Sequence, residues 1–435
     1  MPADPAPPPK DESAEPAAGQ GLIQRYWALV RTFGFAGLTS FSNLLVVVVM
    51  LIAARVLGRE DFGALAYAQS LAILVMTPVS FGLDQLAQRE VSRQKDLASH
   101  YLFNHLLWAM LLALVLLGLT AAGLTAFEDD GRLRLVILLT AATWGLRIVT
   151  ISAQIYFRPF DRYGRESSIA LSGQTVYLVL CLATLWLAPG LIPFVIAIFV
   201  ARVIWITIAL VSVGRRIGFS CRLDPRLVLR LQRLALPIGV VIALNAAYTQ
   251  IDVLILRSQL DLEAVGVYGA ALKIYLALFM LPAIVNSVLL PRLSASSVSG
   301  DERRHRRMSW AGGGLLFAIS LPMVGLGVLL APWIMETLFG PEYAGGARVL
   351  QLLFVAAGIS FQVIYARTLF VVLDRQRVMA WIIFLGLVVR AGLVWGLTRI
   401  WGIEGAAIAV LVSESAVLSL CWGYIASRRG APARL

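Results

Sequence analysis

The stretch LIPFVIAIFVARVIWITIALVSV, residues 191–213, decides the class of fold. It holds a single charge, Arg202, among 23 residues, and about 20 mostly apolar residues suffice for a helix to cross a bilayer. Similar stretches recur along nearly the whole chain. The sequence therefore predicts an all-α polytopic membrane protein of about twelve transmembrane helices, at 34–57, 62–86, 101–127, 133–157, 167–188, 191–213, 232–256, 263–290, 309–335, 344–372, 378–399 and 403–427.

The composition agrees with this prediction and narrows the function. The 435 residues are 59% hydrophobic and 14% charged, with a mean hydropathy of +0.81, outside the usual range of soluble domains. No connection is long enough for a soluble catalytic domain, and no nucleotide-binding loop or paired metal-binding histidines occur, so we expect no enzyme activity, no cofactor and no metal. The net charge of +12 resides in short connections, which argues against nucleic-acid binding.

The basic residues predict the orientation and the division of the chain. Of the 37 Lys and Arg, 25 fall in one set of alternate segments, which includes both termini, and seven in the other, so both termini are expected to be cytoplasmic. The longest basic connection separates two sets of six helices. We therefore expect a disordered cytoplasmic tail (1–21), an N-terminal six-helix lobe (22–213), a basic linker (214–233), a C-terminal six-helix lobe (234–427) and a second tail (428–435).

A weak internal repeat supports two lobes. The segment GREDFGALAYAQ, residues 58–69, follows the first span, and LDLEAVGVYGAA, residues 260–271, follows the seventh. Each is an acidic turn that leads into a helix rich in small residues. Six spans in each half would give the two copies the same orientation in the membrane.

Charges within the apolar spans are the candidate functional residues, because each costs about 2.5–3.5 kcal/mol at mid-membrane unless it has a partner or a wet cavity. A cationic cavity would suit a pyrophosphate, because guanidinium groups bind phosphate oxygens in a bidentate fork. Arg202 could instead form an ion pair and Arg367 could extend to the interface. The spans contain the basic residues Arg147, Arg202, Lys273, Arg367 and Arg390 and the acidic residues Asp84, Asp252 and Glu414.

Two of the acidic residues are candidates for coupling to an ion gradient. Asp252 follows Asn245, Tyr248 and Gln250 in an otherwise apolar span, and Glu414 lies in the middle of the last span. Either could bind a proton or cation, and either could merely neutralise a neighbouring basic residue.

Seven segments in order along the chain form a pattern that points to a known family. They are ARVLGREDFGALAYAQSLAIL (54–74), FGLDQLAQREVSR (81–93), QIDVLIL (250–256), VGVYGAALKI (265–274), LLPRLSA (289–295), FGPEYAGGARVLQLL (339–353) and GIEGAAIA (402–409). Together these segments resemble the polysaccharide transporter (Wzx-type flippase) family of the multidrug/oligosaccharidyl-lipid/polysaccharide (MOP) exporter superfamily. The resemblance implies a MATE-like fold, two six-helix lobes around a cavity that opens alternately to each side, and an undecaprenyl-pyrophosphate-linked oligosaccharide as substrate.

The functional prediction is a flippase of the cell inner membrane for surface polysaccharide synthesis. Its pyrophosphate site is predicted at Arg147, Lys273 and Arg390, with Arg202 and Arg367 as further candidates. Its expected partners are the lipid-linked oligosaccharide and the bilayer, with a polysaccharide polymerase and chain-length machinery as candidates. The alternatives are a lipid II flippase, which would be expected to have two further spans, a drug/ion antiporter, which should prefer an acidic cavity, and a membrane glycosyltransferase or polymerase.

Overall fold

The computed structural model describes residues 18–298 and 302–427 and is helical along nearly all of that length. The predicted tails 1–21 and 428–435 lie outside these residues, except that the first helix already begins at Ala18. The long helices are α1 (Ala18–Met76), α3 (Ala98–Phe127), α4 (Gly131–Gln154), α5 (Tyr163–Leu187), α6 (Leu191–Arg216), α7 (Pro225–Gln259), α8 (Leu262–Leu278), α9 (Met280–Val298), α10 (Glu302–Ile334), α11 (Ala347–Val372) and α12 (Gln376–Ser427), and α2 (Leu83–Arg93) is shorter.

The twelve predicted spans can be followed in these helices, and the protein is a multi-pass membrane protein. Among the described residues, nine helical segments are long and apolar enough to cross a bilayer, and one of them, α12, contains two predicted spans. Its backbone leaves helical geometry at Trp401 and Gly402, between those spans. In the same way α1 contains the first span and most of the second, which meet at a kink at Gly58.

Three prolines interrupt predicted spans, with different results. At Pro78 the second span breaks into a 3-10 turn (Thr77–Val79), and the chain resumes as α2. The eighth span divides at Phe279, between α8 and α9, three residues before Pro282. This position is expected because proline cannot donate a helical hydrogen bond and its ring clashes with the carbonyl four residues earlier. Pro322, in contrast, lies inside the continuous helix α10.

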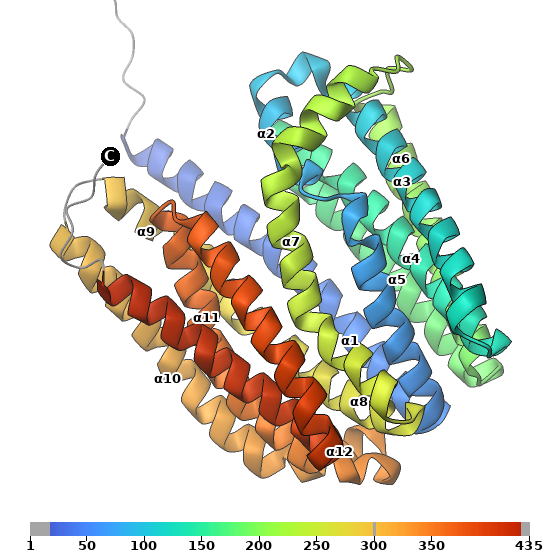
Figure 1. Ribbon diagram of the computed structural model, residues 1–435. Coiled ribbons are helices and arrows are strands. Elements are labelled where there is room, and N and C mark those ends of the chain that lie inside the picture. Colours follow the sequence, from blue (N-terminus) through green and yellow to red (C-terminus); the bar gives the residue numbers. More distant parts are fainter. Residues whose placement is uncertain (1–17, 299–301, 428–435) are drawn as a thin grey trace, which may run out of the picture.

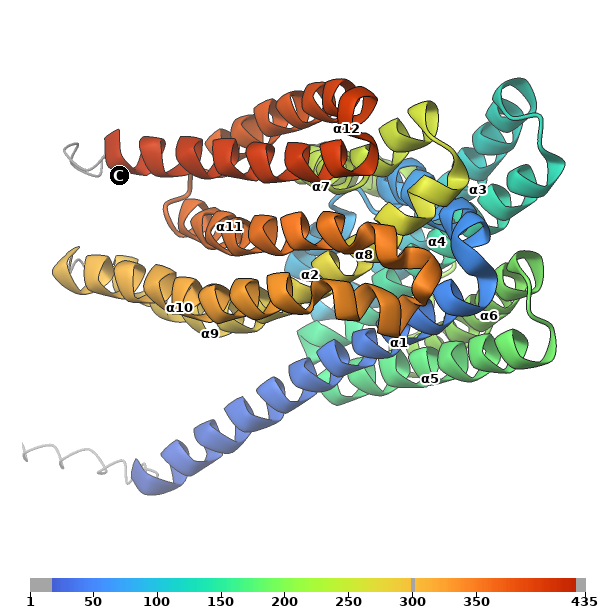
Figure 2. The same ribbon diagram turned by 90° about the horizontal axis from the view of Figure 1, so that it is seen from below.

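The helices form two groups with three helices between them. Helices α3–α6 lie on one side and α9–α12 on the other, while α1, α7 and α8 lie where the groups meet (Figures 1 and 2). Helix α1 packs on α4 and α5 as well as on α7 and α8. The segment that joins the halves is only 217–224, because α6 and α7 both extend into the predicted linker.

The two halves cross most closely where the second part of α1 meets α8. A Cβ atom on Gly63 would overlap the carbonyl oxygen of Leu262, and a Cβ on Gly266 would overlap that of Arg59. These contacts are reciprocal, because Gly63 and Gly266 are 203 residues apart in sequence, and so are Arg59 and Leu262. The crossing therefore has local two-fold symmetry and relates the two repeat segments, as the weak sequence repeat suggests.

Further contacts between the halves surround this crossing. Arg59 forms an ion pair of 2.7 Å with Glu263, and the Tyr343 hydroxyl donates to the Ala54 carbonyl at 2.8 Å. The halves are thus closed against each other at this end. Toward the opposite end, where α2 and the connection from α6 to α7 lie, the two groups of helices diverge (Figure 1).

Candidate functional site: a cationic cavity between the halves

A cavity of about 290 Å³ lies next to the α1–α8 crossing. Helices α1, α4, α5 and α6 form one wall, and α7 and α8 form the other. Three of the predicted cations line it, Arg147 from α4, Arg202 from α6 and Lys273 from α8, and none of the lining residues is acidic. In the described part of the chain, none of these three cations forms an ion pair.

Arg202 is the most deeply buried of the three. Its side chain is 5% exposed, and its guanidinium lies 4.9 Å from the ring centres of both Tyr177 and Trp205. Such contacts with aromatic faces stabilise a cation without neutralising it. Its Nε and Nη1 atoms are buried and have no hydrogen-bond partner. Arg202 therefore offers unused donors in a cavity that an anion could enter.

Arg147 is held in a similar way. Its guanidinium lies 4.6 Å from the ring centre of Trp144, one helical turn earlier in α4. Both residues line the cavity, so the indole orients the guanidinium without competing for its N–H donors. Arg147 and Arg202 together concentrate positive charge on the N-terminal wall.

Lys273 faces them from the C-terminal half. Its ammonium donates a hydrogen bond of 2.6 Å to the Oε1 atom of Gln69 on α1. This bond joins the two halves at the level of the cavity. Because the acceptor is a neutral amide, this hydrogen bond does not cancel the charge of the ammonium group.

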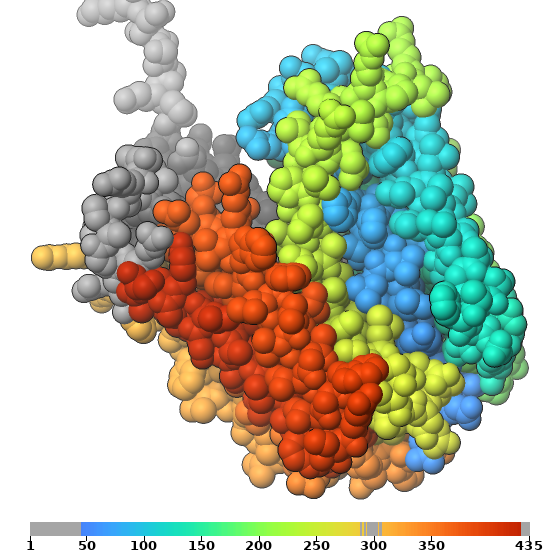
Figure 3. Space-filling view, in the orientation of Figure 1, coloured from blue at the N-terminus to red at the C-terminus, as the bar shows by residue number. Residues whose placement is uncertain are grey.

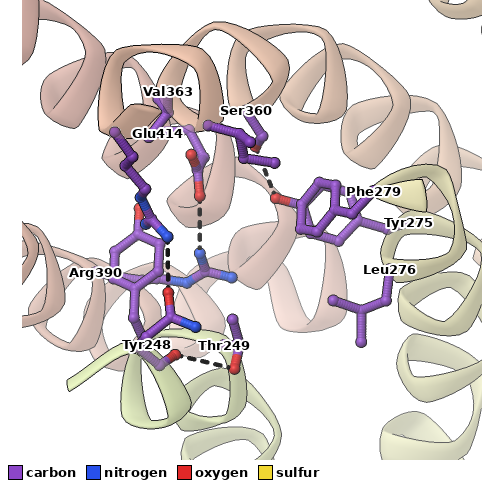
Figure 4. Close-up of a pocket in the computed structure, with 12 residues that line it drawn as sticks. Tyr248, Thr249, Tyr275, Leu276, Phe279, Ser360, Val363, Arg390 and Glu414 are labelled. Carbon is purple, nitrogen blue, oxygen red and sulfur yellow. Dashed lines mark hydrogen bonds and ion pairs between the residues drawn. The ribbon is translucent and has the colours of Figure 1, made fainter. Parts of the chain in front are cut away.

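The other two predicted cations line a separate, smaller pocket of about 100 Å³ between α7, α8, α11 and α12 (Figure 4). Arg390 is 2% exposed and donates two hydrogen bonds to Asp252, from Nε to Oδ1 at 2.8 Å and from Nη2 to Oδ2 at 2.5 Å. Its Nη1 atom reaches Glu414 at 3.4 Å. Arg367 donates to the Asn245 side-chain oxygen at 2.7 Å.

Arg390 differs from the cations of the larger cavity because a carboxylate neutralises its charge. Asp252 is fully buried and also accepts a hydrogen bond of 3.0 Å from the Tyr268 hydroxyl. Both of its oxygens are therefore occupied. The structure thus divides the five predicted cations into two sets, since Arg390 and Arg367 belong to the C-terminal half and only Arg147, Arg202 and Lys273 share the cavity.

The sequence also matches the model of a known protein family. The model of the family described as "Polysaccharide biosynthesis protein" matches residues 31–297. The chain belongs to this family. The resemblance noted in the sequence is thereby confirmed, while a search of curated proteins found no match.

Solved structures show that this family member has the fold of MOP superfamily transporters. An inward-facing multidrug resistance MATE family transporter is 14% identical, with a TM-score of 0.73 over 90% of this chain and 96% of that one. The lipid II flippase MurJ, in an inward closed conformation, is also 14% identical, with a TM-score of 0.75 over 90% of this chain and 87% of that one. An outward-facing MATE family transporter is 15% identical and gives 0.62 over 94% and 96%.

Of the polar, uncharged residues that line the cavity, only Gln250 was noted from the sequence. Amides and hydroxyls from four helices join the cations there. In the sequence these residues appear only as isolated glutamines or pairs of threonines within apolar spans. A search for charged residues within the spans does not find them. These residues are Gln69, Ser70, Thr140, Thr143, Gln174, Tyr177 and Gln250.

Proposed function

We propose that the protein is a flippase that carries a polyprenyl-pyrophosphate-linked oligosaccharide across the cell inner membrane for surface polysaccharide synthesis. The observation that carries this proposal is a cavity between the halves with three cations and no acidic lining residue. A buried positive charge without a carboxylate is costly, and a phosphorylated ligand offsets that cost when it binds. The family assignment supports a carrier of polysaccharide precursors.

The cavity suits the junction between the phosphates and the sugar. Arg147 and Arg202 can present guanidinium forks to phosphate oxygens, and the neighbouring amides and hydroxyls can bind sugar hydroxyls. A volume of about 290 Å³ is at the lower limit of small-molecule pockets, so we assign it the pyrophosphate and the adjoining sugar rather than a whole oligosaccharide. The prenyl chain would stay in lipid. A surface groove in which α1 is visible between α7 and α3 (Figure 3) is one place where it could lie.

We infer that the structure represents the state open to the cytoplasm. Both termini and the basic connection from α6 to α7 are assigned to the cytoplasmic side by their Lys and Arg content. The halves diverge toward the end that carries this connection (Figure 1), and they meet at the opposite end.

The alternatives fit less well. A carrier of cationic drugs would need carboxylates in its cavity, and the lining residues include none. A glycosyltransferase or polymerase would need acidic residues near a donor sugar, and the same cavity lacks them. The similarity to MurJ makes a lipid II carrier the nearest rival, and transport of lipid II by the purified protein in preference to other lipid-linked sugars would favour it.

Neutralising the cavity arginines tests the proposal. We expect Arg147→Gln and Arg202→Gln each to lower the flipping of a fluorescent polyprenyl-pyrophosphate glycan in proteoliposomes by about tenfold or more, because each removes a charge-assisted hydrogen bond. Arg399→Gln is the matched control. Its guanidinium also lies 4.6 Å from an indole, that of Trp395, but Arg399 does not line the cavity, so its rate should match wild type. Wild-type rates in both cavity variants, at equal protein levels, would refute the proposal.

We assign coupling to a proton gradient to Glu414 rather than to Asp252. Glu414 lines the small pocket and has one long contact to Arg390, whereas both oxygens of Asp252 are bonded. We expect flipping to rise when the outside is acidified in wild type and to be independent of the gradient in Glu414→Gln. Glu342→Gln, an exposed carboxylate at the closed end, should keep the dependence. A gradient response in Glu414→Gln equal to wild type would remove this assignment and leave the flippase proposal intact.

A further inference from the structure

The cavity cations lie on two walls that belong to different halves of the protein. Arg147 on α4 and Arg202 on α6 come from the N-terminal half. Lys273 on α8 is the one charged residue that the C-terminal half contributes to the lining. A ligand with two phosphates can contact both walls at once, whereas a ligand with one phosphate has fewer oxygens to share between them.

The position of Lys273 depends on Gln69. A lysine ammonium sits on a flexible four-carbon stem, and two guanidinium groups in the same cavity repel it. The Oε1 atom of Gln69 holds it at 2.6 Å, while the Nε2 atom of the same amide points to the sulfur of Met50 at 3.8 Å. Both contacts of this amide thus fix its direction toward Lys273.

The neutrality of Gln69 matters as much as its position. Arg390 is also fixed by a partner, but that partner is Asp252, which cancels its charge. Gln69 orients Lys273 through a hydrogen bond and leaves the charge available to a ligand. Arg390 and Lys273 thus differ in whether the partner that orients them cancels their charge.

We propose that Gln69 is a positioning residue that makes the carrier selective for pyrophosphate over monophosphate, by holding Lys273 where it contacts the second phosphate. This inference rests on the proposed function, since it assumes that phosphorylated lipids enter the cavity. Gln69 itself acts through Lys273 and need not touch the ligand.

The test measures binding of two soluble probes, farnesyl diphosphate and farnesyl monophosphate, to the full chain in nanodiscs. Wild type should bind the diphosphate more tightly. Gln69→Met keeps the length and net charge of the cavity but removes the acceptor, so the diphosphate affinity should fall about tenfold while the monophosphate affinity changes less than about threefold. Gln69→Glu has the shape of glutamine but neutralises Lys273, so it should lose at least as much diphosphate affinity.

The controls separate the possible failures. Gln351→Met, another glutamine in a membrane helix but outside the cavity, should leave the ratio of the two affinities unchanged. An equal loss for both probes in Gln69→Met, or no loss for either, would overturn the positioning role. Wild-type protein that binds neither probe would instead count against the flippase proposal itself.

Discussion

Replacing Asp252 by alanine is expected to destabilise the protein by about 3–5 kcal/mol, because it leaves Arg390 charged and buried with one long contact to Glu414. The loss should appear as a decrease of about 10 °C in the thermal unfolding midpoint of the purified protein in detergent. The Tyr268 hydroxyl would also lose its acceptor, which adds to the cost.

A double variant distinguishes a lost ion pair from a general defect in packing. Asp252→Ala combined with Arg390→Met removes both charges, so much of the lost stability should return. Asp61→Ala is a matched single substitution, since its partner Arg132 is half exposed and can be solvated. If Asp252→Ala unfolds at the wild-type temperature, the buried pair does not hold the C-terminal half together.

Valine at either glycine of the α1–α8 crossing is expected to abolish closure of the end that we assign to the outside. Any Cβ on Gly63 or Gly266 would overlap a carbonyl oxygen of the opposite helix, so the helices must separate by a distance that backbone atoms cannot absorb locally. The flipping rate should fall by at least about tenfold, because a carrier must close each end in turn.

Distances between spin labels would report this separation. Labels at Phe127 and Ile400, exposed at the closed end of opposite halves, should move several ångströms apart in Gly63→Val and Gly266→Val relative to the parent, in a background without the native cysteines. Gly118→Val is the control, because a Cβ there meets nothing within 4 Å. Unchanged distances and rates in both crossing variants would show that the close approach has no role in closure.

Hydropathy predicted the fold well because membrane insertion depends on summed apolar character over about 20 residues, which sequence displays directly. The helix ends were less predictable. Helix α7 begins at Pro225, seven residues before the predicted span, since Asp224 caps its first turn and the helix continues beyond the apolar stretch. Hydropathy registers the lipid-exposed part of a helix and not its aqueous extension.

The site was less accessible to sequence reasoning because partners are set by tertiary packing. Sequence shows that Arg390, Asp252 and Glu414 are charges within spans, but 138 residues separate the first two, and nothing local indicates that they meet. The role that we propose for Gln69 was invisible in the sequence for a second reason. An uncharged amide carries no membrane-cost signal, and its importance emerges only when the ammonium of Lys273 is seen beside it.

The glycine crossing has a consequence for how such carriers can diversify. The closest approach there is between the glycines and main-chain carbonyl groups, while Gln69 and Lys273 of the cavity lie about two turns farther along the same helices. New glycan preferences could therefore accumulate through changes in the chamber lining without altering this close approach. Grafting the chamber lining of a related carrier onto this backbone should redirect cargo choice and preserve closure at the crossing.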